Sequence, residues 1–134
     1  MTADIRETGV ELYRRWASMW NGELQIAREI IAEGFSVHLT ADAVPPSEPI
    51  RDAPSVARWV AAIRERGIDL SYAIELGPLV DGDLVTAYWR LTGLRRMPDG
   101  APPQPFVRVG IDILRWRQDR IVECWTMNNN APLA

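Results

Sequence analysis

The first residue that could do chemistry is Asp112, which lies between two isoleucines in the segment GIDILRW, residues 110–116. The alternation of this segment predicts a β-strand. A carboxylate among β-branched residues is costly to bury unless it is paired or protonated. In an apolar cavity its pKa rises, so it can donate a hydrogen bond to a developing enolate oxygen or move protons as a general acid/base. Asp112 is therefore a candidate catalytic residue.

The parity of this strand leaves two orientations open. Asp112 shares one face with Arg108, Gly110, Leu114 and Trp116, and the other face carries Val107, Val109, Ile111 and Ile113. If the mixed face lines a cavity, the apolar face needs a cover, and the simplest cover is a second subunit in a homodimer. If the apolar face is core instead, Arg108 and Asp112 are a solvated pair.

His38 is the only histidine and the second candidate catalytic residue. Its unperturbed pKa of ~6.5 suits the removal of a proton beside a carbonyl group. It also alternates with Ser36 and Thr40 at the end of a short strand, so a plain surface histidine is an equal alternative.

Six tryptophans are spread through the chain. Each one alone is a core candidate, but a convergent set lines a pocket for flat, apolar ligands. Together with Arg108, the candidate substrate-binding residues are Trp16, Trp20, Trp59, Trp89, Trp116 and Trp125. The single cysteine, Cys124, is expected to be a small hydrophobe without a chemical role.

The composition excludes several classes of protein. The 134 residues predict a single domain, 1–134, and the formal net charge of −3 with only isolated arginine pairs argues against nucleic acid binding. One histidine and one cysteine are too few for a structural zinc site or a disulfide. No apolar segment is long enough to cross a membrane, and no signal peptide or cofactor motif is present. We expect a soluble, cytoplasmic protein that needs no cofactor and binds a small apolar organic molecule.

The first half of the sequence has helical spacing of its apolar residues. It predicts a helix from Ala3 to Trp20, ended by Asn21-Gly22, and a second helix from about Glu23 to Ala32, stopped by Gly34. A short strand, residues 35–40, and a proline-rich loop follow. A third helix is predicted with Asp52 near its start, and Gly67 is expected to cap it.

The second half alternates with period two. Strands are predicted at residues 71–76, 83–93, 106–116 and 121–127, with the turn VDGD between the first two, whereas the tail NNNAPLA shows no pattern. Three helices, one short strand and a four-strand antiparallel meander predict an α+β domain.

Five segments in this order resemble the nuclear-transport-factor-2-like superfamily, particularly its SnoaL-like polyketide cyclase branch. They are WASMWNG, IAEGFSVH, APSVARWV, VDGD with YWRLTG after it, and GIDILRWRQDRIVECW. The resemblance implies a cone-shaped fold, with N-terminal helices packed on a strongly curved antiparallel sheet around an apolar pocket. It also implies that Asp112 points into the pocket and that His38 lies at its mouth, although a one-residue slip puts Leu39 there.

The resemblance implies a cofactor-independent cyclase or isomerase for an apolar, carbonyl-bearing, polyketide-type intermediate, with Asp112 and His38 sharing the acid/base work. Two departures narrow this class. Helix one offers Tyr13 but no tyrosine one turn deeper, which argues against a steroid-isomerase oxyanion hole, and the last strand lacks the aspartate of limonene epoxide hydrolases. The alternative is a non-catalytic ligand-binding or dimerising module of the same fold.

Overall fold

The computed structural model describes residues 4–40, 43 and 45–133. Within them the helices are α1 (Ile5–Trp20), α2 (Ala27–Ile30) and α3 (Ala53–Arg64), with short 3-10 turns at Leu24–Ile26 and Pro98–Gly100. The strands are β1 (Ile31–His38), β2 (Gly67–Asp81), β3 (Leu84–Arg95), β4 (Gln104–Arg117) and β5 (Arg120–Ala131). The predicted α+β class is confirmed.

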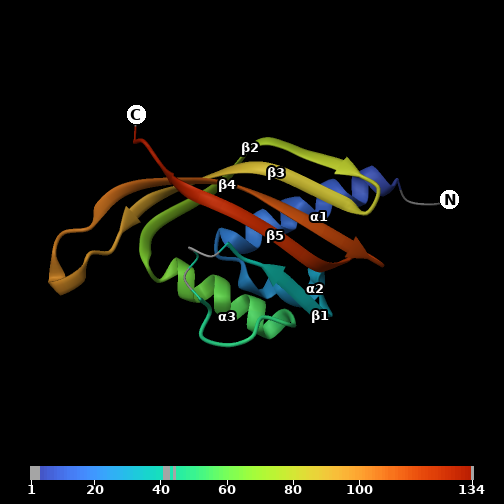
Figure 1. The fold of residues 1–134 in the computed structure, drawn as a ribbon, viewed down its shortest axis with the longest axis horizontal. Coiled ribbons are helices and arrows are strands. Elements are labelled where there is room, and N and C mark those ends of the chain that lie inside the picture. Colours follow the sequence, from blue (N-terminus) through green and yellow to red (C-terminus); the bar gives the residue numbers. More distant parts are fainter. Residues whose placement is uncertain (1–3, 41–42, 44, 134) are drawn as a thin grey trace.

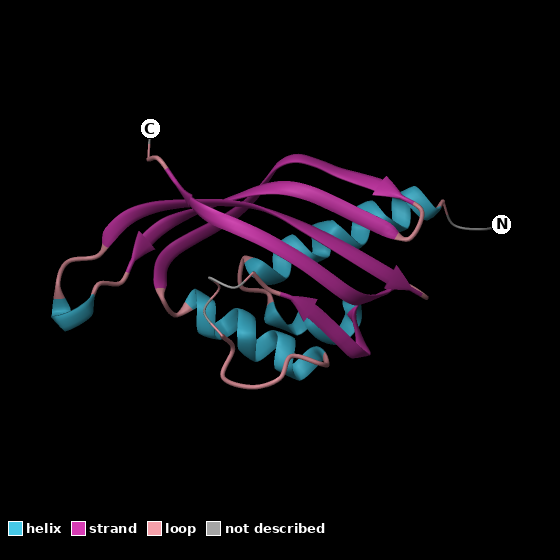
Figure 2. Cartoon of the chain, viewed as in Figure 1, coloured by secondary structure: helices cyan, strands magenta, loops and turns pink. Residues whose placement is uncertain are grey.

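One curled, open sheet organises the molecule (Figures 1 and 2). Its strand order is β1-β5-β4-β3-β2. The predicted antiparallel meander of β2 to β5 is present, but β1 adds to β5 in parallel, so the sheet is mixed rather than purely antiparallel. The helices cover one face, and between the two layers lie fully buried large side chains such as Tyr13, Trp16, Met19, Phe35 and Leu114.

The ends of α1 and α3 follow from local side-chain chemistry. The Asp4 carboxylate caps the start of α1 by accepting from the Arg6 N–H, and Asn21 with Gly22 ends the helix as predicted. Ala3, the predicted first residue of this helix, lies outside the described residues. Asp52 caps α3 through a reciprocal pair of hydrogen bonds with Ser55.

Three local predictions differ from the structure. The second helix ends at Ile30, because Ile31 already pairs with Ile121 of β5 and continues the chain as β1. Gly34 does not stop a helix; with φ of +79° it lies inside β1, where the pairing register shifts. Gly67 is the first residue of β2, and Glu65 is the C-cap of α3.

The strands are longer than their sequence patterns indicate. Strand β5 continues through the three asparagines to Ala131, although asparagine is a poor strand former. The reason is tertiary, because β4 offers a backbone partner at each position, including Arg108 for Asn130 and Val107 for Ala131.

Candidate functional site

A cavity of about 800 Å³ lies between α1, α3, residues 43 and 45–50, and the inner face of the sheet. This volume is in the usual range for sites that hold small organic molecules. Four of the six tryptophans line it: Trp16 and Trp20 from α1, Trp59 from α3 and Trp89 from β3.

Asp112 projects from β4 into this cavity and is only 3% exposed. Its Oδ2 accepts hydrogen bonds from the Trp16 indole N–H at 3.0 Å and the Tyr72 hydroxyl at 3.2 Å. Its Oδ1 accepts from the Thr126 hydroxyl at 2.6 Å. The carboxyl group is therefore buried, oriented from three sides and in contact with the cavity.

Burial dominates the electrostatics of Asp112. Desolvation raises the pKa of its carboxyl above the usual value, and the hydrogen bonds from Thr126, Trp16 and Tyr72 lower that pKa by less. The Trp89 indole also favours the charged form, although its N–H forms no hydrogen bond of normal geometry with a described residue. A raised pKa brings the carboxyl closer to the range in which it both accepts and donates protons at neutral pH.

The strand register explains why these groups meet. Asp112 of β4 pairs with Thr126 of β5, and two residues along the strand Gly110 pairs with Asn128 on one side and Trp89 on the other. A Cβ at Gly110 would lie 2.6 Å from the Trp89 ring and 2.5 Å from the Asn128 Cβ. Glycine is thus needed at this position for the indole to lie across the inner face of the sheet.

Tyr72 and Thr126 are site residues that the sequence analysis missed. The Tyr13 hydroxyl lies 2.9 Å from the Tyr72 hydroxyl, which in turn donates to Asp112, so the three groups form a buried chain. Burial raises the pKa of both phenols, and the Asp112 charge raises them further. The only sequence signal for Tyr72 is its place on the apolar face of a predicted strand, which a core tyrosine shares.

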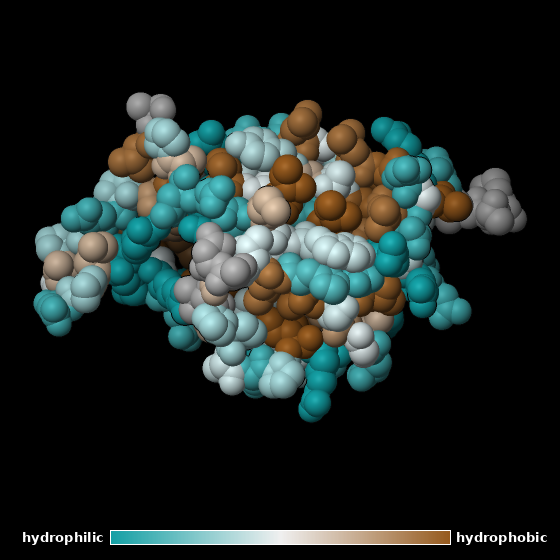
Figure 3. All heavy atoms as spheres, viewed as in Figure 1, coloured by the Kyte–Doolittle hydropathy of each residue, from teal (hydrophilic) through white to brown (hydrophobic). Residues whose placement is uncertain are grey.

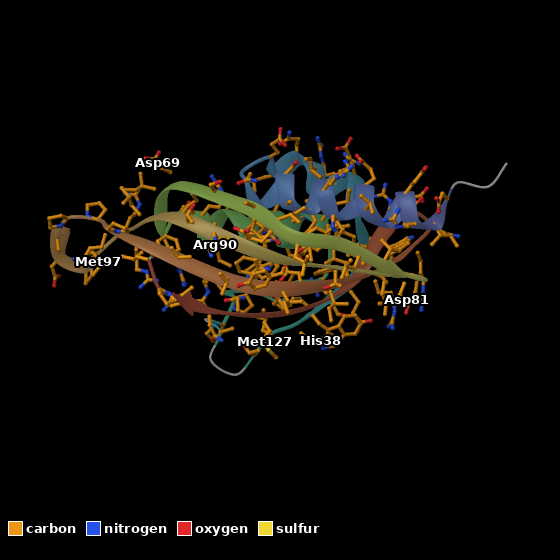
Figure 4. All side chains as sticks on the ribbon, turned by 90° about the horizontal axis from the view of Figure 1, so that it is seen from above. His38, Asp69, Asp81, Arg90, Met97 and Met127 are labelled. Carbon is orange, nitrogen blue, oxygen red and sulfur yellow. The ribbon has the colours of Figure 1, made fainter. Side chains whose placement is uncertain are left out.

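The structure does not bring His38 into the cavity. His38 pairs with Trp125 across the parallel β1–β5 junction, and its Nε2 lies 2.6 Å from a carboxylate oxygen of Glu123. Figure 4 shows His38 and Met127 on the side of the sheet away from the helices. The next residue, Leu39, lines the cavity instead, so the slip allowed by the sequence is the arrangement found.

Two predicted tryptophans also lie away from the cavity. Trp116 is buried against α1, so close to Gly9 that a Cβ there would lie 2.7 Å from the indole. Trp125 stacks on His38 at 5.0 Å and has the Arg115 guanidinium 5.2 Å from its ring centre, on the outer face. Both follow the alternation of their strands, but neither contacts the space that a ligand would fill.

Arg108, a predicted substrate-binding residue, is among the residues that line the cavity. Its Nε donates to the Asn128 side-chain oxygen and its Nη1 donates to the Asn130 side-chain oxygen at 3.2 Å. The tail asparagines, to which the sequence analysis gave no role, therefore orient a cation over the cavity.

The remaining features to examine in the described residues are the cysteine, clusters that could hold a metal ion, and helices that could span a membrane. Cys124 is buried and free, and burial raises the pKa of its thiol. No three His, Cys, Asp or Glu side chains of residues 4–40, 43 and 45–133 are grouped so as to hold a metal ion. None of the helices in that part of the chain is both long and apolar enough to span a membrane.

Comparison with solved structures finds close matches in fold. A candidate SnoaL-like polyketide cyclase from Jannaschia sp. CCS1 is 21% identical over 96% of this chain and 90% of its own, with a TM-score of 0.74. A candidate polyketide cyclase from Acidithiobacillus ferrooxidans is 19% identical over 95% of this chain and 92% of its own, with a TM-score of 0.76. At these identities the likeness shows a shared fold.

A third structure is similar in sequence as well. IdmH from Streptomyces antibioticus, a candidate polyketide cyclase, is 25% identical over 89% of this chain and 90% of its own, with a TM-score of 0.74. No curated protein sequence matches the chain. The SnoaL-like domain family matches residues 11–124, a span that runs from α1 into β5. The chain therefore belongs to the SnoaL-like family, the polyketide cyclase branch of the nuclear-transport-factor-2-like superfamily.

Proposed function

We propose that the protein is a cofactor-independent cyclase or isomerase that acts on an apolar, carbonyl-bearing, polyketide-type intermediate. The observation that carries this proposal is the Asp112 carboxyl group, which is 3% exposed, lines the cavity and is held by three hydrogen-bond donors. The family match and the fold of IdmH support the substrate class. The free cysteine is consistent with the cytoplasm as its location.

The arrangement suits enolate chemistry. Asp112 takes a proton from the carbon beside a substrate carbonyl, and the C–H electrons move into the carbonyl group to form an enolate. Tyr72 lines the cavity beside Asp112, and its single hydroxyl proton is bonded to the Asp112 carboxylate at rest. Once Asp112 has taken up the substrate proton, the Tyr72 hydroxyl turns to donate its hydrogen bond to the enolate oxygen. The enolate carbon then attacks a second carbonyl carbon of the same molecule, and the alkoxide oxygen so formed receives the proton from Asp112.

His38 has no part in this scheme, because its side chain is on the outer face. Asp112 therefore takes both the base and the acid role, which a single carboxyl group can do because taking up a proton converts it from the base into the acid. The indoles of Trp16, Trp20, Trp59 and Trp89 hold the substrate folded, so that its reacting carbons meet.

The first prediction concerns proton abstraction. We expect the wild-type protein to exchange the deuterium beside the ketone of a tetralone probe for solvent hydrogen, and Asp112→Asn to lower the exchange rate by at least about 100-fold. The rate is followed by NMR, with circular dichroism to confirm that the variant folds. Asp99→Asn, which removes an exposed carboxyl, is the matched control.

Two results count against this proposal. Exchange that is undiminished in Asp112→Asn removes Asp112 from the mechanism. Exchange by the wild-type protein no faster than in buffer favours the non-catalytic binding module of the same fold.

We also propose that the protein is a homodimer through the outer face of the sheet. Large apolar side chains are exposed there, with Ile111 at 47%, Ile113 at 36% and Met127 at 65%. Figure 3 shows brown, hydrophobic spheres gathered over these strands. Of the other residues assigned to this face, Val109 is half-buried and Val107 is buried, so the exposed patch is centred further along β4 than expected.

A further inference from the structure

Two indole N–H groups in the cavity wall lack an acceptor. The nitrogens of Trp20 and Trp89 are shielded from solvent and have no hydrogen-bond partner among the described residues, and both side chains line the cavity. Trp89 as a whole is only 5% exposed. A buried donor without an acceptor is costly, and nearly all buried polar groups of native proteins have a partner. Each of these two groups is therefore a candidate to bind an oxygen atom of a ligand.

Of the two, Trp89 is placed beside Asp112. It pairs with Gly110, which lies two residues from Asp112 on the same face of β4, and its ring atom Cζ2 would be 2.6 Å from a Cβ on that glycine. In an indole, Cζ2 is attached to the carbon that carries the N–H, so the N–H edge also lies over β4. Desolvation raises the pKa of the Asp112 carboxyl, and the Trp89 indole is among the groups that lower it. The N–H is thus near this carboxyl without forming a hydrogen bond of normal geometry to it.

The described donors that bind Asp112 are already engaged. Its Oδ2 accepts from the Trp16 indole and the Tyr72 hydroxyl, and its Oδ1 accepts from the Thr126 hydroxyl. Each of these donors has a single proton, so none can hold a substrate oxygen while it binds the charged carboxyl. Tyr72 becomes available once Asp112 has taken up a proton, whereas the Trp89 N–H has no such bond to give up.

The Trp89 ring is also held in place by its neighbours. The Tyr72 ring stacks on it with 5.1 Å between centres, and Gly110 leaves room for it across the inner face of the sheet. A donor that is fixed before charge develops does not have to reorganise during the reaction. Because its nitrogen is shielded from water, a ligand oxygen bound there does not compete with solvent, and in such surroundings a hydrogen bond is stronger than in water.

We infer that the Trp89 indole N–H is a further catalytic group, which binds the ketone oxygen of the substrate and stabilises the negative charge that develops on it. The inference rests on the proposed function for the role of Asp112. The Asp112 carboxylate takes the proton from the carbon beside the ketone, the C–H electrons form the new C=C bond, and the carbonyl π electrons move to the oxygen. This oxygen is carried by the neighbouring carbon, so a donor beside Asp112 lies where the charge appears.

The first test observes the Trp89 N–H directly in the wild-type protein. The indole N–H signals are assigned in proton–nitrogen NMR spectra and followed during titration with a tetralone. The comparison ligand is the matching methylene-tetralin, a hydrocarbon of the same shape in which a methylene group replaces the ketone oxygen. We expect the ketone to move the Trp89 proton signal downfield, as a new hydrogen bond does, and the hydrocarbon to cause a clearly smaller downfield shift.

The second test removes the donor. Trp89→Phe keeps an aromatic ring beside Tyr72 but has no N–H, so we expect it to lower the deuterium exchange rate at saturating tetralone by about 100-fold. Trp125→Phe is the matched control, because it makes the same change on the outer face of the sheet and should leave the exchange rate unchanged. Circular dichroism shows whether each variant folds, and the titration of the wild-type protein decides the matter if Trp89→Phe does not.

Several results would overturn the inference. They are equal shifts with the two ligands, movement of the Trp20 signal in place of the Trp89 signal, no binding of the ketone at millimolar concentration, and equal exchange rates in folded Trp89→Phe and Trp125→Phe. Failure of the proposed function looks different. Asp112→Asn keeps Trp89, so that variant should still show the downfield shift with the ketone, and a wild-type protein that shows the shift without exchange would retain the ketone site and lose the proposed chemistry.

Discussion

The burial of Asp112 has opposite consequences for chemistry and for stability. A carboxyl group removed from water is a better proton carrier near neutral pH, but its charged form is destabilised in the folded protein. The three donors, Trp16, Tyr72 and Thr126, offset part of that cost without cancelling it, since the pKa remains raised. Burial of Asp112 therefore lowers the stability of the folded protein, a cost that is typical of residues kept for function and not for structure.

The second prediction is a pH dependence of stability. Because the pKa of Asp112 is higher in the folded than in the unfolded chain, the folded protein holds more protons between these two values. The free energy of unfolding therefore falls as pH rises from the unfolded pKa, about 4, through the folded pKa. The stabilisation that comes from the proton on Asp112 is fully present only below this range of pH. Asp112→Asn removes this dependence, so its melting temperature relative to wild type should increase across the window and then level off.

The measurement is a series of thermal unfolding curves at closely spaced pH values. The informative quantity is the change with pH in the difference between the melting temperatures of wild type and Asp112→Asn. The amide of the variant faces the same hydrogen-bond donors at every pH, so it adds only a constant offset to that difference. Asp99→Asn serves again as the exposed control. A difference between wild type and Asp112→Asn that does not change with pH would show that the carboxyl titrates at its ordinary value.

At the scale of elements, one residue joins the end of α1 to the strand that carries Tyr72. The Asn21 side chain donates to the Tyr72 carbonyl oxygen at 2.9 Å and accepts from the Tyr72 N–H at 2.8 Å. The Arg64 guanidinium adds a bond from α3 to the Trp20 carbonyl oxygen at 2.7 Å. The last turn of α1 is therefore tied to both β2 and α3, which fixes Trp20 and Tyr72 with their rings stacked, 6.5 Å apart between centres, in the cavity wall.

The third prediction is that Asn21→Ala lowers the free energy of unfolding by about 1–2 kcal/mol, the net value of two partly buried hydrogen bonds. The backbone of Asn21 has ordinary negative φ, so alanine introduces no strain there. Urea denaturation of the wild type, this variant and Asn129→Ala, an exposed asparagine of β5, provides the comparison. An equal loss in the two alanine variants would mean that the link between α1 and β2 contributes no stability of its own.

At the scale of the whole molecule, the two faces of the sheet have different tasks. The concave face, covered by helices, carries Asp112, Thr126 and Trp89. The convex face carries exposed apolar side chains of β2 to β5, with an ion pair between Glu75 and Arg90 at 3.0 Å among them. An exposed apolar patch bordered by charged residues is typical of an interface between protein molecules.

The fourth prediction follows from this division. Sedimentation velocity at micromolar concentration should show a dimer for the wild type and a monomer for Ile111→Arg, because an unpaired charge at the centre of an apolar interface is strongly unfavourable. Leu133→Arg, which changes a residue 65% exposed beyond the end of β5, should remain dimeric. A wild-type monomer would contradict the proposal, as would a dimer that Ile111→Arg leaves intact.

The sequence by itself determined the periodic elements and which side chains share a face of each strand. The strand alternation around Asp112 and Trp89 predicts which side chains share a face, because successive residues of a strand point to opposite sides whatever their neighbours are. The caps at Asp52 and Asn21 are likewise local, since a side chain bonds the backbone a few residues away. Together with the family resemblance, these signals were sufficient to predict the fold and to direct attention to Asp112.

Only the tertiary structure decided which neighbours those side chains meet. His38 and Leu39 differ by one position, and the pairing of β1 with β5 turns the histidine outward and the leucine into the cavity. Trp116 shares a strand face with Asp112, yet it packs against α1 beyond the cavity. The asparagine tail becomes a strand because β4 supplies partners for its backbone, and only then does Asn130 bring Arg95 and Arg108 together. Each of these contacts joins residues far apart in the chain, so it depends on strand register and helix packing, which local periodicity does not specify.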